Sequence, residues 1–297
     1  MAGKILVVGS LHLDVIVHSS RLPKPDETLL GDKVSYRFGG KGGNQALAAA
    51  KIDVQVFMAG RIGTDNFGKQ IYDTLSNQNI NLDGLKIVDE ATGMSVALIG
   101  SDGIYCAVVV SGANQTIDLS EIAVPDDLTV LVLQNEINTD ANFEIIKKVP
   151  KSTFVILNAA PALTPNKDFF ERIDLLIVNQ LEAKMLLNEE PSIFNNLDAL
   201  RKLQNLGPKE VIITLGAEGY TGISKNGEIF SEPGIKVDVL STHGAGDSFV
   251  GTLAAFICKG EPINIAAQYA QASSALHVKT PIDQREKILQ ADIENMF

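Results

Sequence analysis

Short apolar runs alternate with runs of helical periodicity from residue 130 onward, and this alternation restricts the fold more than any other feature. It predicts strands at 130–133, 154–157, 175–178 and 211–214. It also predicts helices at 139–148 and at 197–206, and a helix that follows 179–182 and ends at 187. Such alternation is typical of a parallel, doubly wound α/β sheet with helices on both faces. The run K-I-L-V-V at 4–8 predicts a further buried strand of the same sheet.

Polar residues and glycines come directly after several of these predicted strands. They are Glu136, Asn179, Glu182, Thr214, Gly216 and the turn at 241–247. Ligands of doubly wound sheets bind at the carboxyl ends of the strands. The shared position therefore predicts that these residues contribute to one binding site.

The turn S-T-H-G-A-G-D at 241–247 lies between an apolar run at 237–240, predicted as a strand, and an apolar helical run at 249–257. Gly244 and Gly246 lack Cβ atoms, so backbone N–H groups can converge beside the positive end of a helix. That arrangement suits an anion, and Asp247 stands where it could accept a proton from an attacking hydroxyl. The alternative is that Asp247 caps the helix and the glycines only form the turn.

The segment F-G-G-K-G-G-N at 38–44 opens a helix predicted at 45–50. Four glycines around Lys41 would allow close approach of a ligand, and Asn44 offers both a donor and an acceptor. The alternative is a flexible turn with Asn44 as helix cap. Upstream, His12 and Asp14 alternate, so on a strand they would share one face and could reach a ligand, or they form a surface pair.

A small β layer separate from the main sheet is predicted near the N-terminal half. Apolar runs at 96–100 and 105–110 flank S-D-G at 101–103, which is a hairpin signal, and 29–37 is extended. A hairpin of this kind does not fit inside a parallel sheet. We expect it to form a lid or a contact between two subunits.

Composition argues against several classes of partner, although a local basic site remains possible. The net charge of −11 argues against a nucleic-acid or anionic-membrane surface. Cys106 and Cys258 lie far apart in apolar runs, which predicts no disulfide framework and a reducing compartment. Four scattered histidines give no zinc signature, and no apolar run is long enough for a membrane span or a signal peptide. We therefore expect a soluble cytoplasmic protein.

Seven motifs occur in one order along nearly the whole chain. They are G-S-L-H-L-D at 9–14, G-G-K-G-G-N-Q-A at 39–46, I-G-T-D-N-F-G at 62–68, S-G-A-N at 111–114, N-Q-L-E at 179–182, T-L-G at 214–216 and G-A-G-D at 244–247. In this order the chain resembles the ribokinase-like carbohydrate kinases, the PfkB family. The resemblance implies a single ribokinase-like α/β domain over 1–297, with a β lid from about 12–38 and 94–112 inserted in it.

The resemblance also implies ATP-dependent phosphorylation of a sugar hydroxyl, with Asp247 as the base. The amides of Gly244, Ala245 and Gly246 would form the anion hole. The sugar-binding set would be His12, Asp14, Gly40, Lys41, Asn44, Glu136 and Asp247. The ATP-binding set would be Asn179, Thr214, Gly216, Gly219 and Gly246, with Glu182 holding Mg²⁺ through water. Lids of this family often join two subunits, which implies a homodimer.

Two positions and one segment depart from the family pattern. His12 stands where an Asn is usual, and Ser241 stands where an Asp commonly ligates an activating K⁺. Residues 275–287 lack the Gly-Ala loop that supplies further K⁺ ligands and an adenine wall. A hydroxyl is a much weaker cation ligand than a carboxylate, so no ordinary K⁺ site is predicted. The resemblance favours conversion of D-ribose to ribose 5-phosphate, with a nucleoside kinase or a non-catalytic binding protein as alternatives.

Overall fold

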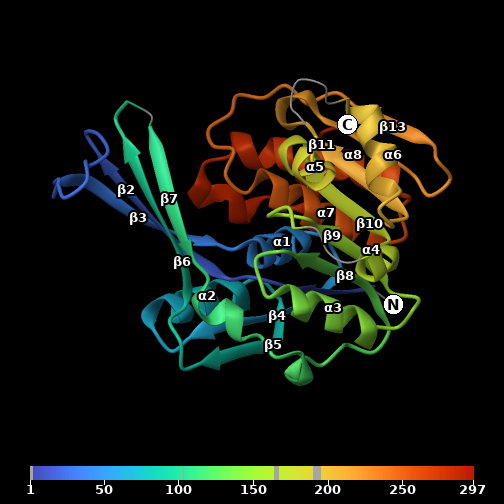
Figure 1. Cartoon of the computed structure of the whole chain (residues 1–297), viewed down its shortest axis with the longest axis horizontal. Coiled ribbons are helices and arrows are strands. Elements are labelled where there is room, and N and C mark those ends of the chain that lie inside the picture. Colours follow the sequence, from blue (N-terminus) through green and yellow to red (C-terminus); the bar gives the residue numbers. More distant parts are fainter. Residues whose placement is uncertain (1–2, 103, 164–166, 190–194) are drawn as a thin grey trace.

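Two β-sheets of different size organise the chain in the computed structural model, which describes residues 3–102, 104–163, 167–189 and 195–297. The large sheet has nine strands and the small sheet has four. Figure 1 shows the small sheet extending from one side of the body that contains the large sheet and the helices. The predicted α/β fold with an additional small β layer is confirmed.

The large sheet contains seven parallel strands and an antiparallel pair at one edge. Its spatial order is β13 (Ile229–Glu232), β12 (Tyr220–Ile223), β11 (Glu210–Thr214), β10 (Leu175–Asn179), β9 (Phe154–Asn158), β8 (Leu128–Gln134), β1 (Lys4–Val8), β4 (Gln55–Gly63) and β5 (Asn81–Val88). The strands predicted at 4–8, 130–133, 154–157, 175–178 and 211–214 are all present. β5 and the β12–β13 hairpin, which are short or strongly polar, were not predicted from the sequence.

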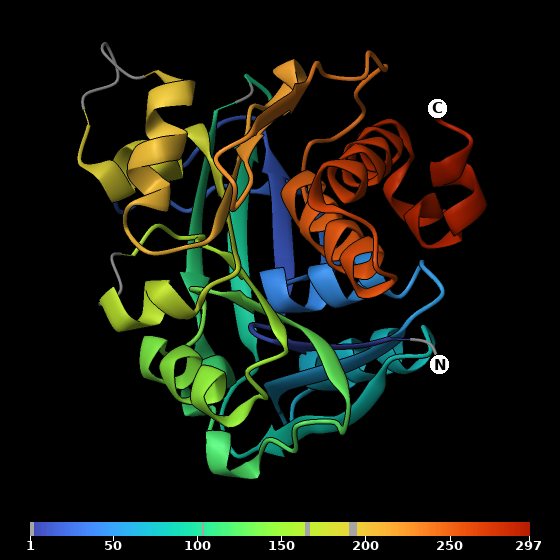
Figure 2. The same cartoon turned by 90° about the vertical axis from the view of Figure 1, so that its right-hand side faces the viewer.

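Helices cover both faces of this sheet (Figure 2). One face carries α1 (Lys41–Ala49), α2 (Asn66–Ser76), α7 (Ala245–Cys258), α8 (Ile263–Lys279) and α9 (Gln290–Glu294). The other carries α3 (Thr139–Lys148), α4 (Lys167–Arg172), α5 (Gln180–Leu187) and α6 (Asn196–Gln204). Short 3₁₀ helices lie at Gly112–Thr116, Leu119–Glu121, Gly216–Glu218 and Ile282–Lys287. Within the described ranges, no helix combines the length and apolar character needed to cross a bilayer.

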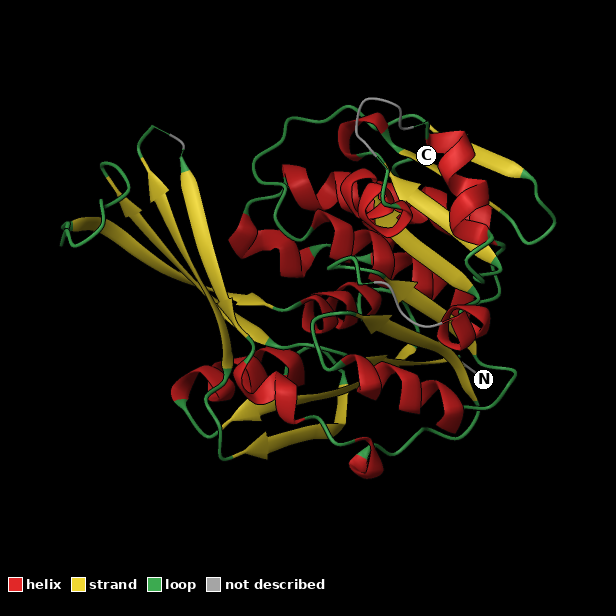
Figure 3. Cartoon of the chain, viewed as in Figure 1, coloured by secondary structure: helices red, strands yellow, loops and turns green. Residues whose placement is uncertain are grey.

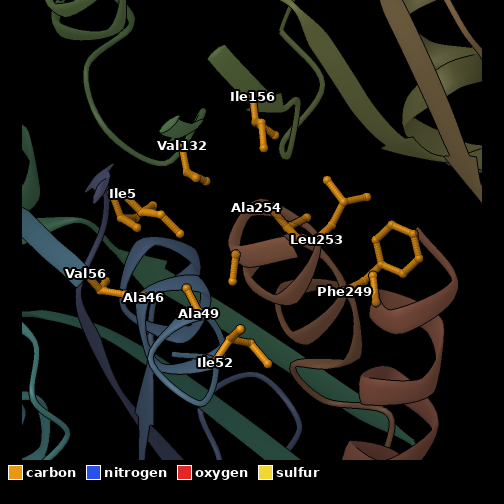
Figure 4. Close-up of a cluster of buried hydrophobic side chains, with 14 of the residues drawn as sticks. Ile5, Ala46, Ala49, Ile52, Val56, Val132, Ile156, Phe249, Leu253 and Ala254 are labelled. Carbon is orange, nitrogen blue, oxygen red and sulfur yellow. The ribbon is translucent and has the colours of Figure 1, made fainter. Parts of the chain in front are cut away.

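The pleat of β1 divides the core into two clusters. Ile5 and Val7 pack toward α1 and α7, whereas Leu6 and Val8 pack toward the helices of the opposite face. In Figure 4, Ala46 and Ala49 of α1 and Leu253 and Ala254 of α7 are drawn as members of one buried cluster. Small residues allow the two helix backbones to approach closely: a Cβ at Gly251 of α7 would overlap the carbonyl oxygen of Gln45 in α1.

The small sheet has the order β3 (Gly31–Gly39), β2 (His12–Ser19), β6 (Gly93–Gly100) and β7 (Tyr105–Val110). The predicted antiparallel hairpin of β6 and β7 is confirmed, although residue 103 in its turn lies outside the described residues. β2 pairs in parallel with β6 and antiparallel with β3. In Figure 3 these strands project together from the part of the molecule that contains the helices.

One predicted strand and one predicted helix boundary are wrong. The apolar run at 237–240 is not a strand: Val239 and Leu240 are exposed, and the Leu240 N–H donates to the carbonyl of Val278 in α8. No neighbouring strand is available there, so β propensity alone does not produce a strand. The helix predicted at 45–50 begins four residues earlier, at Lys41, with Gly40 as its N-cap instead of Asn44.

The glycines of the 39–43 segment make room for the protein's own chain. A Cβ at Gly42 would lie 2.7 Å from the carbonyl carbon of Gly9, and one at Gly40 would lie 2.7 Å from the backbone nitrogen of His12. Gly40 also has a φ of 87°, which favours glycine. These contacts pack the first turn of α1 against the segment after β1. The prediction that the glycines leave space for a ligand is therefore wrong for Gly42, whose Cβ direction is filled by backbone.

We expect Gly42→Ala to destabilise the fold, because backbone atoms of Gly9 and Ser10 cannot move aside as a flexible side chain could. Overpacking costs about 1–3 kcal/mol, and the higher helix propensity of alanine offsets up to about 1 kcal/mol of that cost. Urea denaturation measures the free energy of unfolding. Gly246→Ala is the matched helical control, because its Cβ would meet no atom within 4 Å. Equal stability of the two variants would contradict the packing explanation.

Candidate active site

Polar side chains gather at the carboxyl edge of the large sheet, beside the small sheet. β1 leads to Ser10 and His12, β8 to Glu136, β9 ends at Asn158, β10 at Asn179 and β11 at Thr214. The strand order places β1 between β8 and β4. The chain therefore continues from β1 to β4 and β5 on one side of it, and later to β8 on its other side. This is the switch point at which doubly wound sheets bind ligands.

Asp247 lies in the first turn of α7 and is half-buried. Its two carboxylate oxygens accept hydrogen bonds from α1, one from Asn44 Nδ2 at 3.1 Å and one from Gln45 Nε2 at 3.1 Å. Burial raises the pKa of the Asp247 carboxyl, although the positive charge of Lys41 and these two hydrogen bonds oppose that shift. The result is a fixed carboxylate with increased affinity for a proton.

Gln45 belongs to a buried chain of amides beneath Asp247. Its Oε1 accepts from Gln134 Nε2 at 2.7 Å, and its Nε2 donates to Asn158 Oδ1 at 3.1 Å as well as to Asp247. Such a network allows few alternative rotamers, so it orients the carboxylate. Gln45 and Asn158 were not among the site residues predicted from the sequence. The position of Asn158 directly after a predicted strand was a signal that could have found it.

Lys41 connects the carboxylates of the site. Its backbone N–H donates to Glu136 Oε2 at 2.9 Å, and its Nζ lies 3.9 Å from Glu136 Oε1. Burial opposes the charged form of Lys41, but Asp247, Glu136 and Glu182 together outweigh burial and raise its pKa. The structure thus brings together Lys41, Glu136, Glu182 and Asp247, which are far apart in sequence.

His12 and Asp14 lie on the face of the small sheet that borders this group, and both are buried, with 4% and 7% exposed surface. The interpretation of these residues as a surface pair is therefore wrong. Asp14 accepts hydrogen bonds from Ser95 Oγ on β6 and from His243 Nε2 at 3.2 Å. Burial would raise the pKa of Asp14, but these donors outweigh it and the pKa is lowered.

The ring of His12 has an unpaired polar atom. Burial lowers the pKa of His12, although Glu136 and Asp14 favour its charged form. Its Nε2 is buried and has no hydrogen-bond partner among the described residues. Gly39 and Gly93 are its neighbours on the two adjacent strands, and the imidazole packs against Gly93, where a Cβ would lie 2.4 Å from His12 Cδ2. A buried polar atom without a partner is costly, so this nitrogen is suited to a ligand hydroxyl.

The turn before α7 presents backbone donors beside Asp247. The N–H of Ala245 donates to the carbonyl of Thr242 within the turn. The N–H groups of Gly244 and Gly246 have no acceptor in the part of the chain that the structure describes. A Cβ at Gly246 would meet no atom within 4 Å, so this helix end is open. Two free N–H groups at a helix N-terminus form an anion-binding position.

The far end of the site contains Asn179, Glu182 and Thr214. Asn179 and Glu182 form a capping box at α5, in which each side chain accepts from the other's backbone N–H at 2.8 Å. Thr214 is the partner of Asn179 on the neighbouring strand. These residues form a polar edge that Lys41 links electrostatically to Asp247.

Gly216 and Gly219 differ in their surroundings. A Cβ at Gly216 would meet no atom within 4 Å, which leaves this turn open to a ligand. A Cβ at Gly219 would overlap the carbonyl oxygen of Glu232. Packing of the protein's own chain therefore explains Gly219 without a ligand.

A divalent cation would find one carboxylate of suitable chemistry here. No three His, Cys, Asp or Glu side chains are grouped as a metal cage within the described ranges. Glu182 uses Oε2 for the capping box, and no described donor reaches its Oε1. Mg²⁺ prefers oxygen ligands and is usually held by one or two carboxylates together with phosphates and water. The residues present fit that mode of binding.

Comparisons with known proteins agree over nearly the whole chain. The family model for pfkB family carbohydrate kinases matches residues 2–287. The chain is 32% identical over 292 residues to a ribokinase of Schizosaccharomyces pombe, covering 93% of this chain and 92% of that protein. It is 28% identical over 282 residues to a deoxyribokinase of Salmonella typhi, covering 92% of each.

A solved structure has the same fold throughout. The ribokinase of Arabidopsis thaliana, in complex with ribose and ATP, superimposes with a TM-score of 0.89 and 29% sequence identity. The match covers 100% of this chain and 99% of that chain.

We expect Glu182→Gln to stabilise the fold at neutral pH. Burial raises the pKa of Glu182, despite the hydrogen bond from Asn179 and the charge of Lys41. An acid whose pKa is raised by folding lowers the free energy of unfolding when it is ionised. This destabilisation is complete at pH values above the pKa of the folded state and absent at pH values below the pKa of the unfolded state. Glutamine retains the capping box. The stabilisation of Glu182→Gln relative to the wild type should therefore disappear as the pH falls through the pKa of Glu182 in the folded state.

Urea denaturation of the wild type and of Glu182→Gln across this pH range measures the difference in their free energies of unfolding. Glu218→Gln, which changes an exposed carboxylate, is the control. A variant less stable than the wild type at neutral pH would show that ionised Glu182 is a net stabilising group.

Proposed function

The chain belongs to the PfkB family of carbohydrate kinases, and from this we propose that it transfers the γ-phosphoryl group of ATP to a hydroxyl of D-ribose, giving ribose 5-phosphate. The relatives named as ribokinases and the complex with ribose and ATP support this acceptor and donor. One observation carries the proposal: Asp247, held by two amides, lies within one helical turn of the free N–H groups of Gly244 and Gly246.

Asp247 is the proposed general base. Asn44 and Gln45 hold its oxygens in place, and its raised pKa brings its proton affinity closer to that of a base working near neutral pH. It would accept the proton of the attacking hydroxyl as the new O–P bond forms. Phosphoryl transfer depends mainly on positioning and charge stabilisation, so a fixed carboxylate beside an anion site is sufficient machinery.

The proposed acceptor-binding residues surround this carboxylate. Asp14 is held ionised and can accept hydrogen bonds from sugar hydroxyls, while the unpaired Nε2 of His12 can pair with one more. Lys41, Asn44 and Glu136 supply further donors and acceptors, with Gly40 at the start of α1. A sugar rich in hydroxyls matches a pocket wall made of both charged and neutral polar groups.

The free amides of Gly244 and Gly246 are the proposed anion hole, together with the Ala245 position at the start of α7. Lys41 adds positive charge close to Asp247. Asn179, Thr214, Gly216 and Gly219 are the proposed ATP-binding residues, of which Gly216 has the open surroundings that a ligand needs. Glu182 would hold Mg²⁺ through water, and Mg²⁺ neutralises phosphate charge when it is bound.

We further propose one domain over 1–297 in which the small sheet acts as a lid. Closure would exclude water, which competes with the sugar as acceptor. The edge strand β7 exposes Val108, Val109 and Val110 by 50–67%, which supports a homodimer formed through the lid. The free cysteines are consistent with the proposed cytoplasmic location, and the net charge of −11 is consistent with small-molecule partners rather than nucleic acid or membrane.

The first test measures ADP release with Mg-ATP against D-ribose, 2-deoxyribose, fructose and ribonucleosides. We expect turnover to be greatest with D-ribose, because two buried polar side chains of the lid, His12 and Asp14, are available to its hydroxyls. A preference for nucleosides would make the chain a nucleoside kinase of the same fold. Binding of a sugar or nucleoside from this panel, with no turnover of any of them, would indicate a non-catalytic protein.

Asp247→Asn should lower kcat by about 10²–10⁴-fold, the usual contribution of a general base, and leave ribose affinity nearly unchanged. Steady-state kinetics and calorimetric titration with ribose separate the two effects. Asp198→Asn is the matched control, because Asp198 is also in the first turn of a helix but is exposed. Retention of most of the wild-type kcat by Asp247→Asn would remove Asp247 as the base.

A further inference from the structure

Arg285 is a buried arginine outside every motif that suggested the function. It lies in the 3₁₀ helix Ile282–Lys287 and has 8% exposed surface. Its guanidinium donates to three backbone carbonyls: those of Ser241 at 3.0 Å, His243 at 3.0 Å and Thr280 at 3.2 Å. Two of these carbonyls belong to the turn that leads into the proposed anion hole.

The surroundings of this guanidinium resemble those of a bound cation. No carboxylate of the described residues lies within ion-pair distance of Arg285. Its remaining contact is with His277 Nε2 at 2.8 Å. A positive charge ringed by carbonyl oxygens is the arrangement that proteins use for hard cations.

A separate monovalent cation does not fit here. The resemblance to the family implied a K⁺ ligand at position 241, but Ser241 has no carboxylate. The carbonyl oxygens of Ser241 and His243 already accept from Arg285. We propose that Arg285 serves as a tethered internal cation, which replaces the monovalent ion and orients the anion-hole turn. This inference rests on the proposed kinase function.

Peptide geometry connects Arg285 to the anion hole. In a trans peptide the C=O of one residue and the N–H of the next point in opposite directions. Because the His243 carbonyl points to Arg285, the Gly244 N–H must point away from Arg285. This N–H is one of the two without an acceptor among the described residues. Arg285, together with His277, whose Nε2 lies 2.9 Å from the same carbonyl oxygen, therefore orients a donor that would stabilise the transferred phosphoryl group.

Neighbouring contacts hold the same turn from other sides. Ser274 Oγ donates to the carbonyl of Ala245 at 2.8 Å, and the Leu240 N–H donates to the carbonyl of Val278 at 2.8 Å. These bonds tie the flanks of the turn to α8 and would remain without Arg285. Loss of Arg285 should thus loosen the orientation of the Gly244 amide, because His277 alone would contact the His243 carbonyl, without unfolding α7.

The test compares the wild type with Arg285→Ala in K⁺, Na⁺ and Cs⁺ buffers. The wild-type rate should not depend on the monovalent ion. Arg285→Ala should lose about 10²-fold in kcat, as expected for a misplaced catalytic donor, with a much smaller change in the KM for ribose. Arg285 lines a cavity of about 660 Å³ together with His243, Gly244 and His277, so small cations can reach the vacated position.

Chemical rescue separates this role from a merely structural one. Millimolar guanidinium chloride, far below denaturing concentrations, or K⁺ should restore at least severalfold in the kcat of Arg285→Ala and raise its Tm. Arg285→Lys retains the positive charge but loses the planar arrangement of guanidinium N–H donors, so its kcat should lie between those of the wild type and Arg285→Ala. Arg172→Ala is the control, since Arg172 also donates to backbone carbonyls, at Pro150 and Thr153, and should show no cation-dependent recovery of kcat.

Three results would overturn the proposal: severalfold activation of the wild type by K⁺ over Na⁺, a wild-type kcat in Arg285→Ala, or a loss that no cation reverses. The Tm measurement needs no substrate. If the chain phosphorylates nothing in the acceptor panel, the effect of guanidinium on the Tm of Arg285→Ala still decides whether this position binds a cation. Failure of the kinase assignment and failure of this inference are thereby distinguished.

Discussion

The two hydrogen bonds that hold Asp247 depend on the close approach of α1 and α7. Asn44 and Gln45 reach the carboxylate at 3.1 Å only because a glycine, Gly251, faces the backbone of α1 and alanines fill the rest of the contact. A larger side chain in this contact would separate the helices and lengthen these hydrogen bonds beyond the usual range of about 2.7–3.2 Å. Glycines at the start of α1 serve the same purpose against the segment after β1, so most of the glycine-rich motif is used for packing.

The pKa values of the carboxylates in the site are shifted in different directions. Two donors, Ser95 and His243, help keep Asp14 ionised, and its pKa is lowered. Burial raises the pKa of Asp247 and of Glu182, with Lys41 opposing both shifts. A carboxylate that must bind hydroxyls benefits from remaining ionised, whereas a base benefits from a pKa nearer the working pH. The environments thus match the different roles proposed for these acids.

The turn before α7 joins three parts of the molecule at one residue. The imidazole of His243 donates to Asp14 of the small sheet, its carbonyl accepts from Arg285, and its peptide bond carries the Gly244 amide. Movement of the lid would act on this turn directly through the contact with Asp14. The proposed anion hole is therefore built from the lid and the C-terminal segment as well as from its own helix.

Local patterns in the sequence determined the parallel α/β sheet, the separate hairpin layer, and the placement of Asn179 and Thr214 at one edge. These follow from periodicity and from the rule that carboxyl ends of parallel strands meet. Tertiary structure alone decided that 237–240 is not a strand, that Gln45 and Asn158 support Asp247, and that Arg285 binds the turn at 241–243. Each of these depends on which distant segments come into contact, and a hydrogen bond between residues separated by 44 or 202 positions leaves no periodic trace in the chain.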